Sequence, residues 1–184
     1  MATVASVLAS TLLYATLRYN VLKGVAWVEW PTYVLNKAAA LSALLLGVLA
    51  LWPRATPARA AERMRAAGWL GALHVGLSLA LLGPATYPKY FADGKPTTAA
   101  AWSLLAGVLA AVLVRREGPA SGARSRWHAG LVAFLPGVHA GLLGYGSWLE
   151  PTTWPGYLVP ITLLAFATGC LGLALALLRP GAAR

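Results

Sequence analysis

Long uncharged stretches alternate along this chain with short segments that hold most of its charge. Six stretches are predominantly apolar, and each is near the ~20 residues that an α-helix needs to cross a bilayer core. They cover about residues 3–19, 33–52, 66–82, 99–114, 127–145 and 157–178. Backbone polar groups within a bilayer must be satisfied inside each segment, so each stretch is expected to be a helix. The pattern predicts an all-α integral membrane protein, a six-transmembrane-helix bundle.

The composition agrees with this prediction. Of the 184 residues, 59% are hydrophobic and 11% are charged, whereas a soluble domain carries about 25% charged residues. The formal net charge is +10, but the basic residues gather at helix ends and form no stripe, which argues against nucleic-acid binding. The single cysteine, Cys170, excludes an internal disulfide. No internal repeat interrupts the chain, and residues 1–184 are expected to form a single transmembrane helical domain.

Loop charge sets the expected orientation. Arginines concentrate in residues 53–65, in residues 115–126 and in the tail after residue 178. Cytoplasmic loops are enriched in Lys and Arg, so these segments, and with them both termini, are expected to be cytoplasmic. The third and fifth spans then run in the same direction. The chain is expected to be a multi-pass protein of the cell inner (plasma) membrane, in contact with the lipid bilayer.

The fifth predicted span, Trp127 to Tyr145, carries two of the chain's three histidines. His128 and His139 are eleven residues apart, close to three helical turns, so their imidazoles share one face of the helix. Glycines cluster on the opposite face, where another helix could approach closely; they are Gly130, Gly137, Gly141 and Gly144. The spacing predicts one face for packing and one for imidazole presentation.

His74, in the third predicted span, lies nine residues past Arg65, and His139 lies thirteen past Arg126. The two histidines therefore differ in depth by four residues, or roughly 6 Å. Ionisable residues at membrane depth are costly and usually functional, although a purely structural role for the imidazoles is the alternative. Two imidazoles from neighbouring co-directional helices can bind both axial positions of one haem iron. We therefore predict that His74 and His139 hold the iron of a b-type haem (heme b).

Other residues are candidates for the same site. Gly71 and Ser78 beside His74 leave room for a flat porphyrin. Arg63 lies eleven residues before His74 on the same face and could pair with a haem propionate, or it could extend to the interface. His128 could ligate a second haem, bind a quinone head group or sit at the cytoplasmic interface. A second haem needs another histidine that this chain lacks, which favours the interface.

Two roles are open for the polar residues at the outer ends of the first two spans. Arg18 and Lys37, with Asn20 and Asn36 beside them, are expected to be interfacial anchors; the alternative is an outward site for an anionic or quinone-like electron partner. No Asp or Glu lies within a predicted span, which argues against a zinc or di-iron site and against a proton relay. No strand is expected.

Two stretches resemble the ferric reductase-like transmembrane domain family, which includes the haem-binding membrane subunit of the periplasmic methionine sulfoxide reductase system. They are R-M-R-A-A-G-W-L-G-A-L-H, which ends at His74, and the helix that begins W-H and reaches His139. The resemblance covers residues 63–145 in detail and the six-helix layout more loosely. It implies two histidine ligands to b-type haem and electron transfer across the membrane. It also implies electrons from quinol or a partner flavoprotein, since the similar bacterial members have no flavin domain.

Two functions of different classes are open at this point. The first is electron transfer by haem b between a quinol or flavoprotein donor and an acceptor partner protein. The second is a haem-free membrane anchor or scaffold subunit of a larger complex, which the small size of the chain favours, with glycine-lined helix faces serving subunit packing. A small transporter is disfavoured because the spans hold no acid and no paired broken helices.

Overall fold

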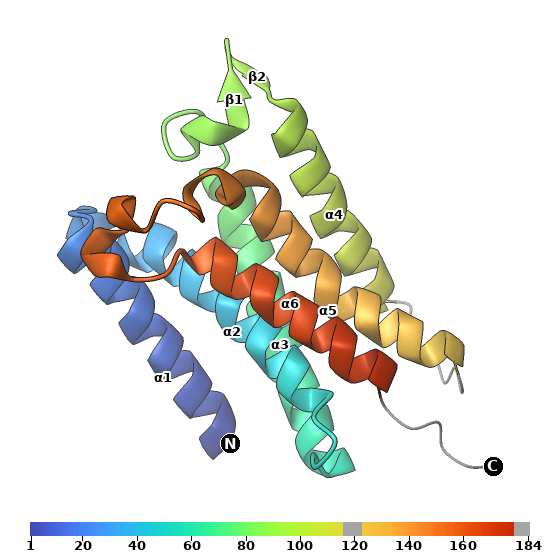
Figure 1. Ribbon diagram of the computed structural model, residues 1–184. Helices are drawn as coiled ribbons and strands as arrows, with labels where there is room; N and C mark the ends of the chain where they lie inside the picture. The colour runs from blue at the N-terminus through green and yellow to red at the C-terminus, as the bar shows by residue number, and fades with distance from the viewer. Residues whose placement is uncertain (116–122, 179–184) are drawn as a thin grey trace.

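The computed structural model describes residues 1–115 and 123–178, and helices dominate it (Figure 1). The six main helices are α1 (Ala2–Thr16), α2 (Leu35–Ala50), α3 (Pro57–Leu81), α4 (Thr98–Arg115), α5 (Ala123–Gly144) and α6 (Ile161–Leu178). A helix therefore occurs at each of the six predicted positions.

Four helical stretches in the described part of the chain are long and apolar enough to cross a membrane. They are Trp27–Ala50, Pro57–Leu81, Arg126–Ser147 and Pro155–Leu178. The apolar stretch of α4, Thr98–Val114, is shorter than these. By the length and composition of these helices, the chain is an all-α membrane protein.

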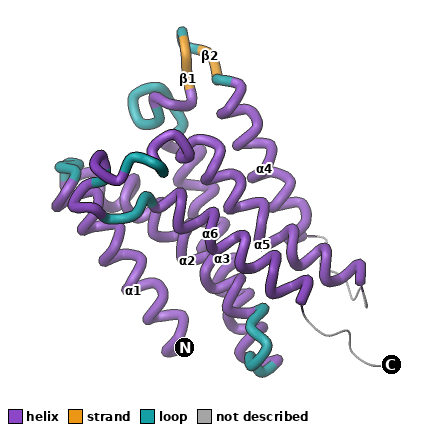
Figure 2. Tube along the Cα trace, viewed as in Figure 1, coloured by secondary structure: helices purple, strands orange, loops and turns teal. Residues whose placement is uncertain are grey.

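Short helical turns and one small hairpin connect the main helices (Figure 2). Two π-helical segments, η1 (Leu17–Leu22) and η3 (Trp30–Val34), continue α1 and lead into α2. The 3₁₀ turns are η2 (Trp27–Glu29), η4 (Pro88–Tyr90), η5 (Tyr145–Ser147), η6 (Pro151–Thr153) and η7 (Pro155–Tyr157).

The expectation of no strands is wrong for the connection between α3 and α4. Strands β1 (Phe91–Ala92) and β2 (Lys95–Pro96) pair in antiparallel fashion. The two residues between them, Asp93 and Gly94, have φ of 52° and 74°. A two-residue turn with positive φ at both positions matches the twist of a hairpin, and Asp-Gly is a favoured pair there.

Helix α3 begins nine residues before the predicted span. The Thr56 hydroxyl caps its first turn by accepting a hydrogen bond from the backbone N–H of Arg59 at 3.4 Å, and Pro57 occupies the first helical position. Both residue types are favoured there. Part of the basic segment 53–65 is therefore helical. The basic segment 115–126 lies partly, and the tail after residue 178 entirely, outside the described residues.

The helices pack as a chain of neighbours. Helix α2 packs against α1, α3 and α6, and helix α5 packs against α4 and α6. In Figure 1 the start of α1, the connection between α2 and α3 and the end of α6 lie at one end of the bundle, and the hairpin lies at the other. The arrangement puts α3 and α4 in different parts of the bundle, joined through the hairpin connection.

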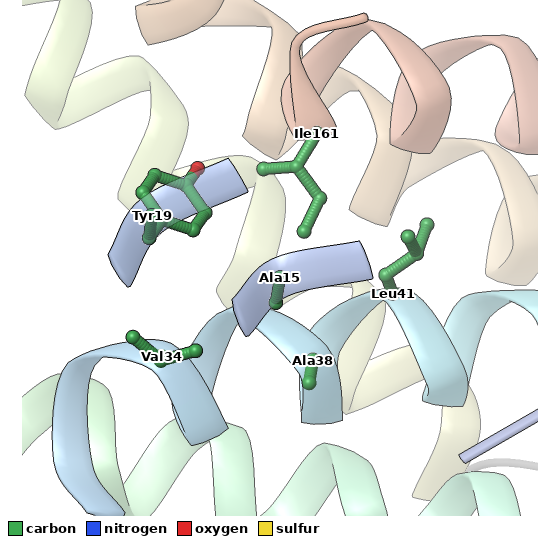
Figure 3. Close-up of a cluster of buried hydrophobic side chains, with 6 residues drawn as sticks. All are labelled: Ala15, Tyr19, Val34, Ala38, Leu41 and Ile161. Atoms are coloured by element: carbon green, nitrogen blue, oxygen red, sulfur yellow. The ribbon is translucent and has the colours of Figure 1, made fainter. Parts of the chain in front are cut away.

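A buried apolar cluster packs α1 and η1 against η3, α2 and α6 (Figure 3). Each member has at most 8% of its surface exposed. The members are Ala15, Tyr19, Val34, Ala38, Leu41 and Ile161. This cluster fixes the start of α2, which carries a residue of the candidate site.

The glycine face of α5 packs against α6, as predicted. A Cβ atom on Gly137 would lie 3.0 Å from the backbone oxygen of Ala165 and 3.2 Å from the Cα of Phe166. Gly130 and Gly144 also face α6 side chains closely. Small residues let two helix backbones approach in this way, and the approach leaves the opposite face of α5 for α4 and the histidines.

Candidate functional site

His74 on α3 and His139 on α5 lie against each other. Their ring centroids are 6.2 Å apart and the ring planes are inclined by 72°. Among the described residues, α3 packs along α2 and has no comparable packing along α4 or α5. The two imidazoles therefore meet between the α2–α3 pair and the α4–α5 pair. The depth comparison predicted that they would lie at a common level.

Asn36 on α2 holds the His74 ring in one orientation and one tautomer. Asn36 is fully buried, and its Oδ1 lies 2.6 Å from Nδ1 of His74. Its Nδ2 donates to the Ser78 hydroxyl at 3.0 Å and to the Tyr87 hydroxyl at 2.9 Å. An amide oxygen only accepts hydrogen bonds, so Nδ1 of His74 carries the proton. Its Nε2 consequently presents a lone pair.

Ser103 on α4 does the same for His139. The Ser103 carbonyl oxygen accepts from Nδ1 of His139 at 2.8 Å, and its hydroxyl donates to the His139 carbonyl at 2.8 Å. Ser103 is fully buried. One helical turn away, a Cβ on Gly107 would lie 3.2 Å from Nδ1 of His139. Only glycine leaves the ring its full space there, and Nε2 of His139 also presents a lone pair.

This donor set suits the axial ligation of a haem iron. Metal-ligating histidines commonly donate their second ring N–H to a protein oxygen, as both do here. The two ring centroids lie 6.2 Å apart, a separation at which both imidazoles could bind one metal ion. Two imidazoles are too few for a zinc site, whereas a porphyrin supplies four further ligands. Nothing lies within 4 Å of a Cβ position on Gly71, beside His74.

Arg63 caps the end of α2. Its Nη1 donates to the Leu49 carbonyl at 2.7 Å, in the last turn of α2, where carbonyls lack partners within the helix. Arg63 lies about 16 Å from His74 along α3. A guanidinium has five N–H donors, so this one bond leaves donors for a further acceptor.

His128 lies about 16 Å from His139 along α5. Its Nε2 is 2.8 Å from the Leu113 carbonyl in the last turns of α4. A carbonyl only accepts, so Nε2 of His128 carries the proton and donates it. Both α5 histidines contact α4, which confirms the prediction that they share one face. The structure brings His74 and His139 together and engages His128 separately.

Two tyrosines of the connection between α3 and α4 contact the residues that hold the two histidines. The rings of Tyr87 and Tyr90 are 5.5 Å apart, and the Tyr87 hydroxyl accepts from Asn36. Burial raises the pKa of Tyr87, and the Asn36 hydrogen bond offsets part of this. Burial likewise raises the pKa of Tyr90, with a partial offset from the Ser103 hydroxyl. Both phenols therefore stay neutral at physiological pH.

Arg18 is not the interfacial anchor that the sequence indicated. It is 8% exposed, and its Nη1 donates to the Leu158 carbonyl. The Tyr14 hydroxyl donates to the adjacent Val159 carbonyl. The connection between α5 and α6 folds over the end of α1 and supplies these carbonyls, so the guanidinium is satisfied inside the protein.

Sequence reasoning missed the partners of the two ligand candidates. The sequence pattern singles out Asn36 only as a neighbour of Lys37 and does not point to Ser103 or Gly107. A signal for the α4 pair exists, because a serine and a glycine four residues apart share one face of an apolar helix. Buried polar residues in membrane helices bond across helices, so a serine on such a face indicates a polar partner on a neighbouring helix.

The fold and this site define a helical membrane protein with a paired-imidazole centre. Comparison with protein-family models, with curated proteins and with solved structures finds no match for the chain. The two buried, hydrogen-bonded imidazoles are therefore the feature that indicates a function.

Proposed function

We propose that this chain is a b-type haem membrane protein that transfers electrons across the membrane, and that His74 and His139 would bind the haem iron. The observation that carries the proposal is the pair of rings 6.2 Å apart, each with Nδ1 bound to a protein oxygen. When bound, haem would supply a one-electron ferric/ferrous couple.

The chain's own residues would position the ligands. Asn36 and the Ser103 carbonyl hold each imidazole in the tautomer whose Nε2 can bind a metal, and such partners raise ligand basicity. Because Asn36 is on α2 and Ser103 is on α4, each ligand is fixed by a neighbouring helix. This support reduces the reorganisation that accompanies a change of charge at the site.

We also propose that all six helices cross the bilayer, with both termini on the cytoplasmic side of the plasma membrane. The basic segment at the connection between α2 and α3 supports this orientation. The start of α1 and the end of α6 lie at the same end of the bundle (Figure 1). In this orientation the hairpin and the tyrosines Tyr87 and Tyr90 are on the outer side.

Electrons would come from quinol or a partner flavoprotein and leave to an acceptor on the outer side, as the resemblance to ferric reductase-like proteins implies. Arg63 would face the cytoplasmic edge of the haem, with donors left for a propionate. One haem is favoured over two, because Nε2 of His128 already donates to the Leu113 carbonyl.

The test is haem content and the reduced-minus-oxidised spectrum of the full chain purified in detergent. We expect one haem per chain with b-type bands. His74→Ala and His139→Ala should lose these bands, because each removes one axial ligand. His128→Ala is the matched control, since it removes an imidazole from the same helix, and it should keep one haem per chain.

A wild-type protein that takes up no haem, either in cells or on addition of hemin, would contradict the proposal. A haem-free anchor or scaffold subunit would then be the better description. Loss of bands in His128→Ala alone would move the ligand assignment to that residue.

A further inference from the structure

Lys37 lies between two tyrosine rings beside the paired histidines. Its Nζ is 4.7 Å from the ring centroid of Tyr87 and 5.0 Å from that of Tyr33. A cation over the face of an aromatic ring is stabilised by the ring quadrupole. The two rings therefore hold the ammonium at a defined place on the outer side of the site.

No carboxylate neutralises this ammonium within residues 1–115 and 123–178. The one ion pair found there joins the N-terminus to Glu62. The other charge that acts on Lys37 is the like charge of Lys23. Membrane proteins usually pair a lysine at such depth with an acid or a carbonyl. Here tyrosine faces take that role and leave its net charge in place.

A short run of contacts links this charge to His74. Lys37 contacts the Tyr87 ring, the Tyr87 hydroxyl bonds Asn36 at 2.9 Å, and Asn36 bonds His74 at 2.6 Å. The ammonium also acts electrostatically on both His74 and His139. Lys23 contacts a different ring, that of Tyr19, at 5.9 Å.

We propose that Lys37 sets the reduction potential of the histidine-bound centre by supplying an uncompensated positive charge on its outer side. The inference rests on the proposed function. Reduction adds one negative charge to the centre, and a nearby cation stabilises the reduced form. A unit charge about 10 Å away, at an effective dielectric constant of about 20, changes a one-electron equilibrium roughly tenfold. Lys37 would therefore act on the reduction potential through its charge, without contact with the metal.

The experiment is a potentiometric titration of the full chain in nanodiscs, followed at the haem bands. Lys37→Met should lower the equilibrium constant for reduction about tenfold, which is about 59 mV for a one-electron couple. Lys37→Gln, a second neutral variant, should behave alike. Lys37→Arg keeps the charge and should stay within about threefold of wild type. Lys23→Met removes an outer charge that contacts Tyr19 and should also change the constant less than about threefold.

The outcomes separate this inference from the proposed function. Haem-free wild-type protein ends the proposed function itself. Haem-bound neutral variants with an unchanged potential overturn only the role of Lys37, as does a shift in Lys23→Met equal to that in Lys37→Met. Loss of haem from both neutral variants also counts against it, because Lys37 would then be needed for folding.

Discussion

Asn36 gives the sharpest test of how the site is supported. It is fully buried on α2, and its amide joins three groups: Nδ1 of His74, the Ser78 hydroxyl and the Tyr87 hydroxyl. Asn36→Leu keeps the branching of the side chain at Cγ and removes all three hydrogen bonds. The His74 ring would lose the partner that fixes its tautomer and its orientation.

The expected effect follows from these contacts. Removing the oxygen that orients a ligating histidine typically lowers metal affinity 10- to 100-fold, or about 1.4–2.7 kcal/mol. The N–H of His74 would also lose its acceptor, and a buried unsatisfied donor costs about 1–3 kcal/mol. A less basic imidazole stabilises the ferric state less, so the reduction potential should rise. Lys37→Met is expected to move it the opposite way.

Hemin titration of the haem-free protein measures the affinity, and potentiometry on the loaded protein measures the second effect. Tyr87→Phe is the matched control, because it removes one acceptor of Asn36 and keeps the Asn36–His74 bond. We expect Tyr87→Phe to bind haem within about threefold of wild type, since the bond at the ligand is the one that tunes affinity.

An Asn36→Leu protein with wild-type haem affinity and an unchanged potential would refute this reasoning. It would mean that the 2.6 Å contact does not act on a metal ligand. Equal losses in Asn36→Leu and Tyr87→Phe would also refute it, because the effect would then come from the polar network as a whole.

Two further predictions follow from α4 and α5. Gly107→Leu should displace the His139 ring and sharply lower the haem-to-protein ratio, since even a Cβ would lie 3.2 Å from Nδ1; Gly76→Ala, in open surroundings, should leave the ratio unchanged. His128→Ala should lower the free energy of unfolding by about 1 kcal/mol through loss of its bond to Leu113. Denaturation in detergent measures that change, and unaltered stability would show that the bond contributes nothing.

The sequence by itself determined the class of protein and the positions of its helices. Long apolar stretches can satisfy their backbone in a bilayer only as helices, so the six helices could be placed from the apolar pattern along the chain. The glycine face of α5 could also be predicted, because helical periodicity fixes which residues share a face. The distances of His74 and His139 to the basic ends of their spans predicted that the two would lie at similar depths, and the structure places their ring centroids 6.2 Å apart.

The helix ends were less predictable. Helix α3 begins at Pro57 because Thr56 caps it, and the hairpin after η4 depends on two residues with positive φ. These are local choices of backbone geometry that a hydrophobic pattern does not report. Arg18 shows the same limit at longer range, since its partner is a carbonyl 140 residues away.

Only the tertiary structure decided which residues support the histidines. Asn36 and Ser103 come from α2 and α4, and nothing local in the sequence links either residue to an imidazole on another helix. Contacts between helices depend on rotation about each helix axis and on packing, which the apolar pattern leaves open because lipid and protein interior are equally apolar. The same packing places Lys37 between the rings of Tyr33 and Tyr87.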